Sequence, residues 1–228
     1  MGDCMKEILL VIPAYNEQDN ILNVLKDIED NLSNCDYLFV NDCSSDGTGK
    51  LLDEHNINHI DLPINLGLAG AVQAGYKYAY YHGYQAAIQF DGDGQHKAIY
   101  IHQMKQELDK GYDIVIGSRF VKQKKSLSLR MLGSRIISFL IKLKTGVTIK
   151  DPTSGMRLMN RKLIYDYAFN MNRKPEPDTL VYQIAKGAKI KEVQVEMNDR
   201  LYGSSIYHST FNSVKYMINI MISIIFFN

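Results

Sequence analysis

Two aspartates one residue apart, Asp91 and Asp93, follow an apolar run at residues 86–90 that is typical of a buried strand. In an extended chain the side chains at positions i and i+2 point to the same side, so both carboxylates would face one point if the strand geometry continues. Hard oxygen ligands held together in this way suit Mg²⁺ or Mn²⁺, which the phosphates of a substrate also bind. The alternative is an acidic surface turn, since Asp and Gly are common in turns.

The segments around this pair alternate at short intervals between expected strands, loops and helices. Short apolar runs rich in β-branched residues predict strands, whereas apolar residues every three or four positions predict helices. The expected strands are 7–12, 37–40, 57–62, 86–90, 113–117 and 190–195, and the main expected helices are 20–31, 67–83, 100–110, 129–143, 163–169 and 211–227. This alternation predicts an α/β fold with a mostly parallel central sheet flanked by helices.

Polar residues gather where the expected strands end. These clusters are Asn16-Glu17, Asn41-Asp42, Asn65, Asp91-Gly92-Asp93 and Gly117-Ser118-Arg119. In open α/β sheets, ligands bind beyond the carboxyl ends of the strands. The sequence therefore predicts that five strand ends converge on one ligand site.

The overall composition indicates a single domain of moderate size in a reducing compartment. The chain has 228 residues and a net charge of +1, which gives no electrostatic reason to expect a nucleic-acid partner. Its three cysteines have no paired spacing, which favours the cytosol and argues against a structural zinc site. The first apolar run, residues 8–12, is too short for a signal peptide, and no stretch reaches the about 18 apolar residues of a spanning helix.

Positive charge is concentrated in one part of the chain. Between Ile114 and Lys150 there is no Asp or Glu, but there are nine Lys or Arg residues. A surface that serves only solubility mixes both signs of charge, so this segment, called the basic segment below, is a candidate for binding an anion. The alternative is a solvated basic face.

An ordered set of motifs carries a family resemblance. The motifs are Ile12-Pro13-Ala14-Tyr15-Asn16-Glu17, Asn41-Asp42-x-Ser44-x-Asp46-Gly47-Thr48, Asn65-x-Gly67-x-x-x-Ala71-x-x-x-Gly75, Asp91-x-Asp93-x-Gln95-His96, Gly117-Ser118-Arg119, Arg130 with Ser134, Asp151-Pro152-Thr153-Ser154-Gly155 and Arg200-x-x-Gly203-x-Ser205. Together they resemble the family 2 glycosyltransferases, and within them the dolichyl- or polyprenyl-phosphate sugar synthases. The resemblance implies the glycosyltransferase A-type fold and a metal-dependent, inverting transfer of a hexose from a UDP- or GDP-linked donor to a polyprenyl phosphate in cell-envelope glycan synthesis.

The resemblance also implies roles for individual residues on the donor side. Asp91, Asp93 and Gln95 would hold Mg²⁺ or Mn²⁺ on the diphosphate, where the cation acts as Lewis acid and template. The residues implied to bind the nucleotide sugar are Pro13, Tyr15, Glu17, Asp42, Asp46, Asn65, Gly67 and Asp91. His96 is a minor candidate for contact with the diphosphate, with a structural role as its alternative.

The acceptor decides which further residues are needed. A lipid phosphate is already ionised, so it needs cations rather than a base. The candidates for this clamp are Arg119, Arg130 and Arg200 with Ser134, which complete the predicted catalytic set with Asp93. A saccharide hydroxyl would need a carboxylate base.

Glu176 or Asp178 is the candidate for such a base. Helix capping is the favoured interpretation of Asp178, because a phosphate acceptor requires no base. Two rival functions remain open: the same enzyme class acting on a saccharide or other hydroxyl, and a nucleotide-sugar-binding protein without turnover.

The last part of the chain is expected to differ from the rest. Residues 1–210 are predicted to form the nucleotide-sugar transferase domain and residues 211–228 an apolar helix. This helix and the amphipathic helix 129–143 suit an anionic membrane surface. We therefore expect a cytoplasmic protein held peripherally on the inner face of the cell membrane, with a dimer contact or packing on its own domain as alternatives for the terminal helix.

Overall fold

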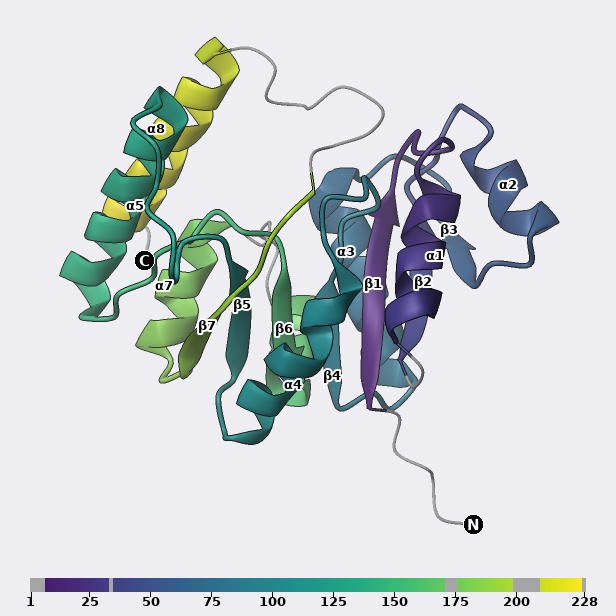
Figure 1. Ribbon diagram of the computed structural model, residues 1–228, viewed down its shortest axis with the longest axis horizontal. Helices are drawn as coiled ribbons and strands as arrows, with labels where there is room; N and C mark the ends of the chain where they lie inside the picture. Colours follow the sequence, from purple (N-terminus) through teal and green to yellow (C-terminus); the bar gives the residue numbers. More distant parts are fainter. Residues whose placement is uncertain (1–6, 33–34, 171–175, 199–209, 227–228) are drawn as a thin grey trace.

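The computed structural model describes residues 7–32, 35–170, 176–198 and 210–226 (Figure 1). Within these residues, seven strands form one sheet in the order β3-β2-β1-β4-β6-β5-β7. The strands are β1 (Ile8–Ala14), β2 (Asp36–Asn41), β3 (His59–Asp61), β4 (Ala86–Gln89), β5 (Ile114–Ser118), β6 (Arg157–Asn160) and β7 (Ile190–Gln194). All neighbouring strands pair in parallel except β6, which is antiparallel to both β4 and β5. The expected α/β fold with a mostly parallel sheet is confirmed.

Helices cover both faces of the sheet. They are α1 (Ile21–Asn31), α2 (Thr48–Glu54), α3 (Gly67–Tyr81), α4 (Ile101–Asp109), α5 (Leu129–Thr145), α6 (Arg161–Tyr165), α7 (Pro177–Ala185) and α8 (Thr210–Phe226), with a 3-10 turn at Ala98–Tyr100 and a π-helical turn at Asp166–Asn170. Apolar residues of α1, α2 and α4 pack on one face, and those of α3, α5, α6, α7 and α8 share the cluster on the other.

Strand β1 shows why the apolar runs are continuous. Leu9 and Val11 belong to the core on one face of the sheet, while Leu10 and Ile12 belong to the core on the other. A strand buried on both faces needs apolar residues at every position rather than at alternate ones.

The strand boundaries differ from the prediction by one or two residues, as β1 and β4 illustrate. β1 continues through Pro13, which pairs with Val40 of β2. The missing N–H of proline costs no ladder bond toward β4, because β4 has already ended at Gln89. The expected strand end at Phe90 is therefore wrong by one residue.

Strand β6 was not predicted at all. Its four residues include Arg157 and Asn160 and no β-branched side chain, so they lack the usual strand composition. Because β6 runs against its neighbours, its first residue pairs with the last residue of β4, Gln89. The turn at residues 151–155 consequently lies at the sheet edge where β4 and β5 end.

The long helix α5 is defined by clear end signals. The Ser128 hydroxyl accepts a hydrogen bond from the Met131 N–H at 3.4 Å, and Gly146 ends the helix with a φ of 74°. In Figure 1, α5 and α8 lie side by side at one end of the molecule, and a Cβ at Gly133 would clash with Met217 of α8. Among the described residues, no helix has the length and apolar character needed to cross a membrane.

Candidate active site

The carboxylate of Asp91 is held from two sides at the end of β4. Gln89 donates its amide N–H to Oδ1 of Asp91 at 2.9 Å. The backbone N–H of Asp91 donates to Nδ1 of His96 at 2.9 Å, so the neutral ring carries its proton on Nε2, which lies 3.4 Å from Oδ2 of Asp91. His96 is only 3% exposed, which fits the structural alternative considered for it. Gln89 and His96 thus orient Asp91.

The extended geometry expected beyond β4 does not continue. Residues 91–95 form a turn, in which Oδ1 of Asp93 accepts the backbone N–H of Gln95 at 3.1 Å. Glycine is needed at position 92, where a Cβ would lie 2.8 Å from the Pro13 carbonyl oxygen, and Gly155 packs closely, since a Cβ there would lie 3.3 Å from Oδ2 of Asp91. The predicted continuation of strand geometry through Asp93 is therefore wrong, and local hydrogen bonds set the positions of Asp91 and Asp93.

The donor set of this turn fits a divalent cation. Asp91, Asp93 and Gln95 offer hard oxygen atoms, and the side chain of Asp91 remains 32% exposed. Among the described residues, no group of three or more His, Cys, Asp and Glu side chains is arranged around one metal position. A cation at this turn would need substrate phosphates or water to complete its ligands.

Hydrogen bonds tie together the loops that follow β1, β2 and β3. Oδ1 of Asp42, a residue only 3% exposed, accepts the backbone N–H of Leu66 at 2.7 Å. Asn16 adopts a left-handed φ of 55°, and its Oδ1 accepts the N–H of Ser45 at 2.9 Å. This bracing fixes the three loops at the same edge of the sheet as Asp91.

The predicted nucleotide-sugar residues lie on these loops, and several serve the local backbone. Tyr15 is 50% exposed. Oδ1 of Asp46 accepts the Thr48 N–H at 2.9 Å, and Oδ1 of Asn65 accepts the N–H of Gly67, whose φ is +70°. All of the predicted residues in this part of the chain lie at the ends of β1 to β3 or in the loops that follow them: Pro13, Tyr15, Glu17, Asp42, Asp46, Asn65 and Gly67. Their contact with a nucleotide remains a prediction.

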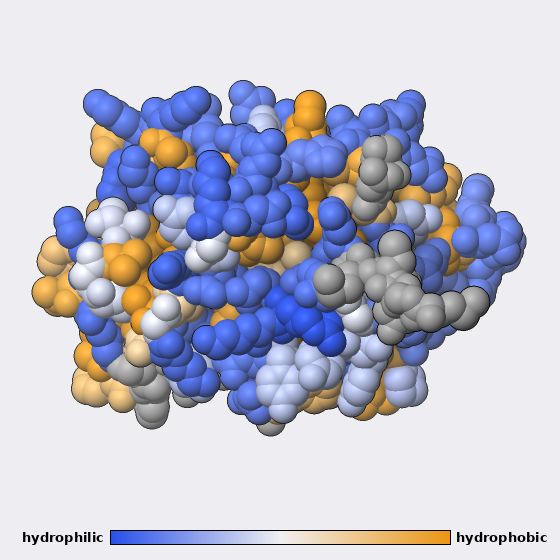
Figure 2. All heavy atoms as spheres, turned by 90° about the horizontal axis from the view of Figure 1, so that it is seen from below, coloured by the Kyte–Doolittle hydropathy of each residue, from blue (hydrophilic) through white to orange (hydrophobic). Residues whose placement is uncertain are grey.

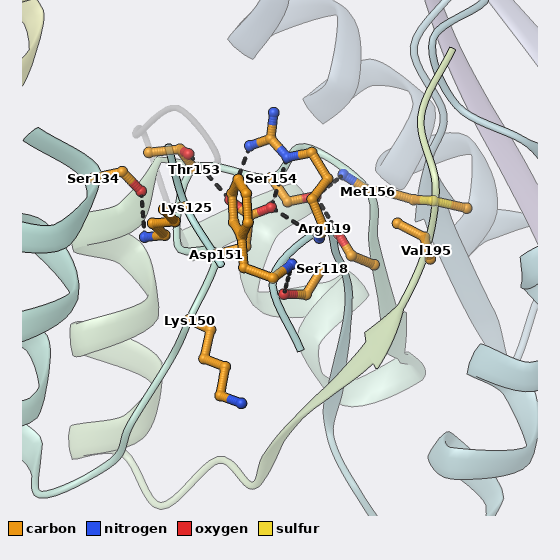
Figure 3. A network of polar contacts seen from close by, with 12 residues as sticks. Ser118, Arg119, Lys125, Ser134, Lys150, Asp151, Thr153, Ser154, Met156 and Val195 are labelled. Atoms are coloured by element: carbon orange, nitrogen blue, oxygen red, sulfur yellow. Dashed lines mark hydrogen bonds and ion pairs between the residues drawn. The ribbon is translucent and has the colours of Figure 1, made fainter. Parts of the chain in front are cut away.

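Arg119 forms an ion pair that the sequence did not reveal. Its Nε and Nη2 donate to the two carboxylate oxygens of Asp151 at 2.8 and 2.9 Å, and its backbone N–H donates to the same carboxylate at 3.1 Å (Figure 3). Asp151 is fully buried. The partners are 32 residues apart, a separation for which no sequence pattern exists. Two of the three guanidinium nitrogens are therefore engaged by a buried carboxylate.

The other clamp candidates have different surroundings. Ser134 is buried in α5, and its hydroxyl accepts a hydrogen bond from Nζ of Lys125 at 2.7 Å. Lys125 was not predicted as a site residue, although it lies in the basic segment; burial lowers the pKa of its ammonium below the usual value. Arg200 and the side chain of Arg130 lie outside the described residues.

A buried arginine holds the turn at residues 151–155. Arg157 is 2% exposed and donates to the carbonyl oxygens of Pro152, Ser154 and Glu176 at 2.8, 3.0 and 3.2 Å. It joins the start of β6 to the start of α7. No sequence pattern indicates this role, since an arginine in a short polar segment is usually exposed.

Asp178 lies in the first turn of α7, as predicted, but its contact is different from capping. Its Oδ2 accepts the hydroxyl of Ser223 in α8 at 2.6 Å, and Oδ1 is buried without a hydrogen-bond partner among the described residues. Asp178 is only 8% exposed. Helix α8 therefore lies over the carboxylate that a hydroxyl acceptor would need.

Comparison with known proteins identifies the family. Residues 9–168 match the family model described as Glycosyl transferase family 2. The chain belongs to this family of glycosyltransferases. It is 33% identical to the UDP-N-acetylglucosamine–dolichyl-phosphate N-acetylglucosaminyltransferase of Methanococcus voltae, over 70% of this chain and 71% of that one. It is 27% identical to the undecaprenyl-phosphate mannosyltransferase of Micrococcus luteus, over 87% and 86% of the two chains.

A solved structure supports the fold of this glycosyltransferase. The structure of glucosyl-3-phosphoglycerate synthase from Mycobacterium tuberculosis, in complex with Mn²⁺, UDP and glucosyl-3-phosphoglycerate, superposes with a TM-score of 0.69 at 15% identity and covers 96% of this chain and 80% of that one. The glycosyltransferase A-type fold implied by the sequence motifs is thereby confirmed.

Proposed function

We propose that this family 2 glycosyltransferase transfers a hexose, with inversion, from a UDP- or GDP-linked donor to a polyprenyl phosphate. One observation carries the proposal: the acidic turn after β4 and the start of the basic segment after β5 lie at the same edge of the sheet. Two relatives whose names include dolichyl-phosphate and undecaprenyl-phosphate acceptors support the lipid class.

The side chains of the acidic turn would serve the departing diphosphate. Negative charge grows on this group as the sugar leaves, and Mg²⁺ or Mn²⁺, when bound, supplies Lewis-acid stabilisation. Asp91, Asp93 and Gln95 are the residues that would hold the cation. Gln89 and His96 keep Asp91 in one orientation, so little reorganisation is needed during the reaction.

The acceptor side is suited to an ionised nucleophile. A phosphate monoester needs no base, and the basic segment contains no carboxylate that would repel it. The rival function, transfer to a saccharide hydroxyl, would use Asp178 as base. Its burial and its bond to Ser223 of α8 make this the weaker alternative.

An apolar stripe on α5 supports work at a membrane surface. Leu132, Ile136, Phe139 and Leu143 follow helical spacing and are 49%, 39%, 63% and 73% exposed. Figure 2 shows orange surface at the left end, the end where Figure 1 has α5 and α8. Apolar side chains beside lysines suit an anionic lipid surface, so we propose peripheral binding to the inner face of the cell membrane through α5 and α8.

The test is a transfer assay with the purified chain. UDP- and GDP-hexoses are offered with Mn²⁺ or Mg²⁺, and either a polyprenyl phosphate or an oligosaccharide as acceptor. A lipid-extractable glycosyl phosphate supports the proposal. Transfer to the oligosaccharide that is lost in Asp178→Asn, or nucleotide-sugar binding without any turnover, contradicts it.

A further inference from the structure

We propose that Lys125, with the hydroxyl of Ser134, forms the contact to the phosphate group of the acceptor. This inference rests on the proposed function and names a residue of the same site that no motif indicated. An anionic acceptor requires a cation that does not already form an ion pair within the protein. Two members of the basic segment, Arg119 and Lys125, can be compared on this point.

Arg119 is balanced by the protein itself. It forms a two-point ion pair with Asp151, which is fully buried and lies 2.8 Å from Nε. A substrate phosphate would have to compete with this carboxylate or share the guanidinium with it. The geometry therefore makes Arg119 a support for the turn at residues 151–155. Of its three guanidinium nitrogens, only Nη1 is not bonded to Asp151.

Lys125 has only neutral partners within hydrogen-bond distance among the described residues. Its Nζ donates to the hydroxyl oxygens of Ser134 at 2.7 Å and Ser138 at 3.3 Å. It forms no ion pair in the part of the chain that the structure describes. Asp151 and Glu192 act on the ammonium only from a longer distance. A half-buried ammonium without a bonded carboxylate favours an anion as its next partner.

The loop that carries Lys125 is fixed to α5, so the ammonium is preorganised. Arg135 donates from Nη2 to the backbone carbonyl of Lys125 at 2.6 Å. Ser138 donates its own hydroxyl proton to the Ser134 carbonyl at 2.9 Å, which leaves its oxygen to accept from Lys125. Three contacts to one helix thus set the position of Lys125.

Ser134 supplies the second donor. It is 2% exposed, and its oxygen accepts from Lys125, but no acceptor for its hydroxyl proton lies among the described residues. Figure 3 shows the Lys125–Ser134 pair beside the turn that holds Asp151 and Thr153. One ammonium N–H and one hydroxyl O–H can therefore meet the same phosphate oxygen or two oxygens of one phosphate.

The two serines lie on the side of α5 away from its exposed apolar stripe. Ser134 is buried, whereas Phe139 and Leu143 are 63% and 73% exposed and lie roughly 100–180° around the helix from Ser134 and Ser138. The stripe therefore gives no preference at Lys125 between a lipid-bound and a free phosphate, and the proposed function is what favours the lipid-bound one.

The experiment compares Lys125→Met and Lys125→Arg with Lys124→Met, an exposed neighbour that serves as the matched control. Steady-state transfer is measured with a long-chain polyprenyl phosphate in vesicles and with a short, water-soluble prenyl phosphate. Loss of a charged hydrogen bond predicts that Lys125→Met raises KM for both acceptors about 10- to 100-fold, with KM for the nucleotide sugar unchanged. Lys125→Arg recovers part of the loss, and Lys124→Met behaves like the wild type. Ser134→Ala gives a smaller rise in the same KM.

Two results overturn the inference while leaving the proposed function intact. In one, the wild type uses prenyl phosphates but Lys125→Met keeps the wild-type KM for both. In the other, KM rises only with the vesicle-borne acceptor, which assigns Lys125 to the membrane surface instead of the phosphate. A wild-type enzyme that transfers to no prenyl phosphate refutes the proposed function itself, and this inference with it.

Discussion

The donor side and the acceptor side of the sheet edge differ in how their polar groups are paired. On the donor side, short hydrogen bonds within the described residues hold Asp42 and Asp91 in place. On the acceptor side, Arg119 is paired with a buried carboxylate, whereas Lys125 meets only hydroxyl groups. The carboxylates on the proposed donor side are thus oriented before any ligand binds. The proposed acceptor side instead keeps a lysine that forms no ion pair with the described residues.

The largest effect is expected from removing charge on the donor side. Asp91→Asn keeps the size of the side chain but weakens the hold on the cation, so we expect kcat to fall about 1,000-fold. Asp30→Asn, an exposed position on α1, is the matched control and should leave kcat unchanged. A chelator applied to the wild type should have the same effect as Asp91→Asn. Turnover that persists in Asp91→Asn would contradict the assignment of the metal site.

The second prediction concerns Arg157, the residue that holds the turn beside Arg119 and joins it to the start of α7. Arg157→Met leaves the buried carbonyl groups of Pro152 and Ser154 without their side-chain donor and removes one of the donors to the Glu176 carbonyl, so we expect a loss of about 3 kcal/mol in the free energy of unfolding. For a chain of this size, that is a decrease of about 6–12 °C in Tm. Lys162→Met, an exposed change on α6, provides the control. If calorimetry gives Arg157→Met the same Tm as the wild type, the hydrogen bonds of Arg157 do not stabilise the fold.

The third prediction tests whether the acceptor side faces a lipid surface. The double change Phe139→Ser and Leu143→Ser removes the two most exposed members of the α5 stripe. Loss of this apolar area predicts about 10- to 100-fold weaker binding to anionic vesicles, measured by co-sedimentation. Ile99→Ser, at a residue 60% exposed elsewhere on the surface, should not alter binding. If the double variant sediments like the wild type, α5 does not contact the membrane.

The smallest effect is expected at His96. His96→Ala removes the ring that accepts the Asp91 N–H and faces its carboxylate, so we expect about tenfold weaker Mn²⁺ binding. His96→Asn restores an acceptor near the position of Nδ1 and should recover part of the affinity. The control is His102→Gln on the exposed side of α4. Unchanged Mn²⁺ titrations in all variants would leave His96 with a packing role alone.

The sequence predicted the parts of this molecule that depend on local pattern. Apolar runs identified six strands, and the five polar clusters from Asn16-Glu17 to Gly117-Ser118-Arg119 follow strand ends as expected. Strand β6 escaped because Arg157 and Asn160 break the strand composition, although the ladder with β4 is well formed. The pairing with neighbours, rather than intrinsic preference, makes this segment a strand.

Contacts between distant parts of the chain could not be predicted. The position of Arg119 at the end of a strand and that of Asp178 in the first turn of a helix were both expected, but their partners lie 32 and 45 residues away. Periodicity indicates which face of an element is buried but gives no information about which side chain it meets there. For the same reason, the sequence did not distinguish Lys125 from the other eight basic residues of the basic segment.

The Arg119–Asp151 ion pair has a consequence for how this fold can diversify. The stretch between these residues leaves the sheet at the end of β5 and returns before β6, and the pair fastens its two ends together. The ion pair therefore holds the two ends of this stretch together independently of what lies between them. With the proposed acceptor site in this stretch, we expect that exchanging residues 119–151 between relatives changes the preferred acceptor and leaves the preferred nucleotide sugar unchanged.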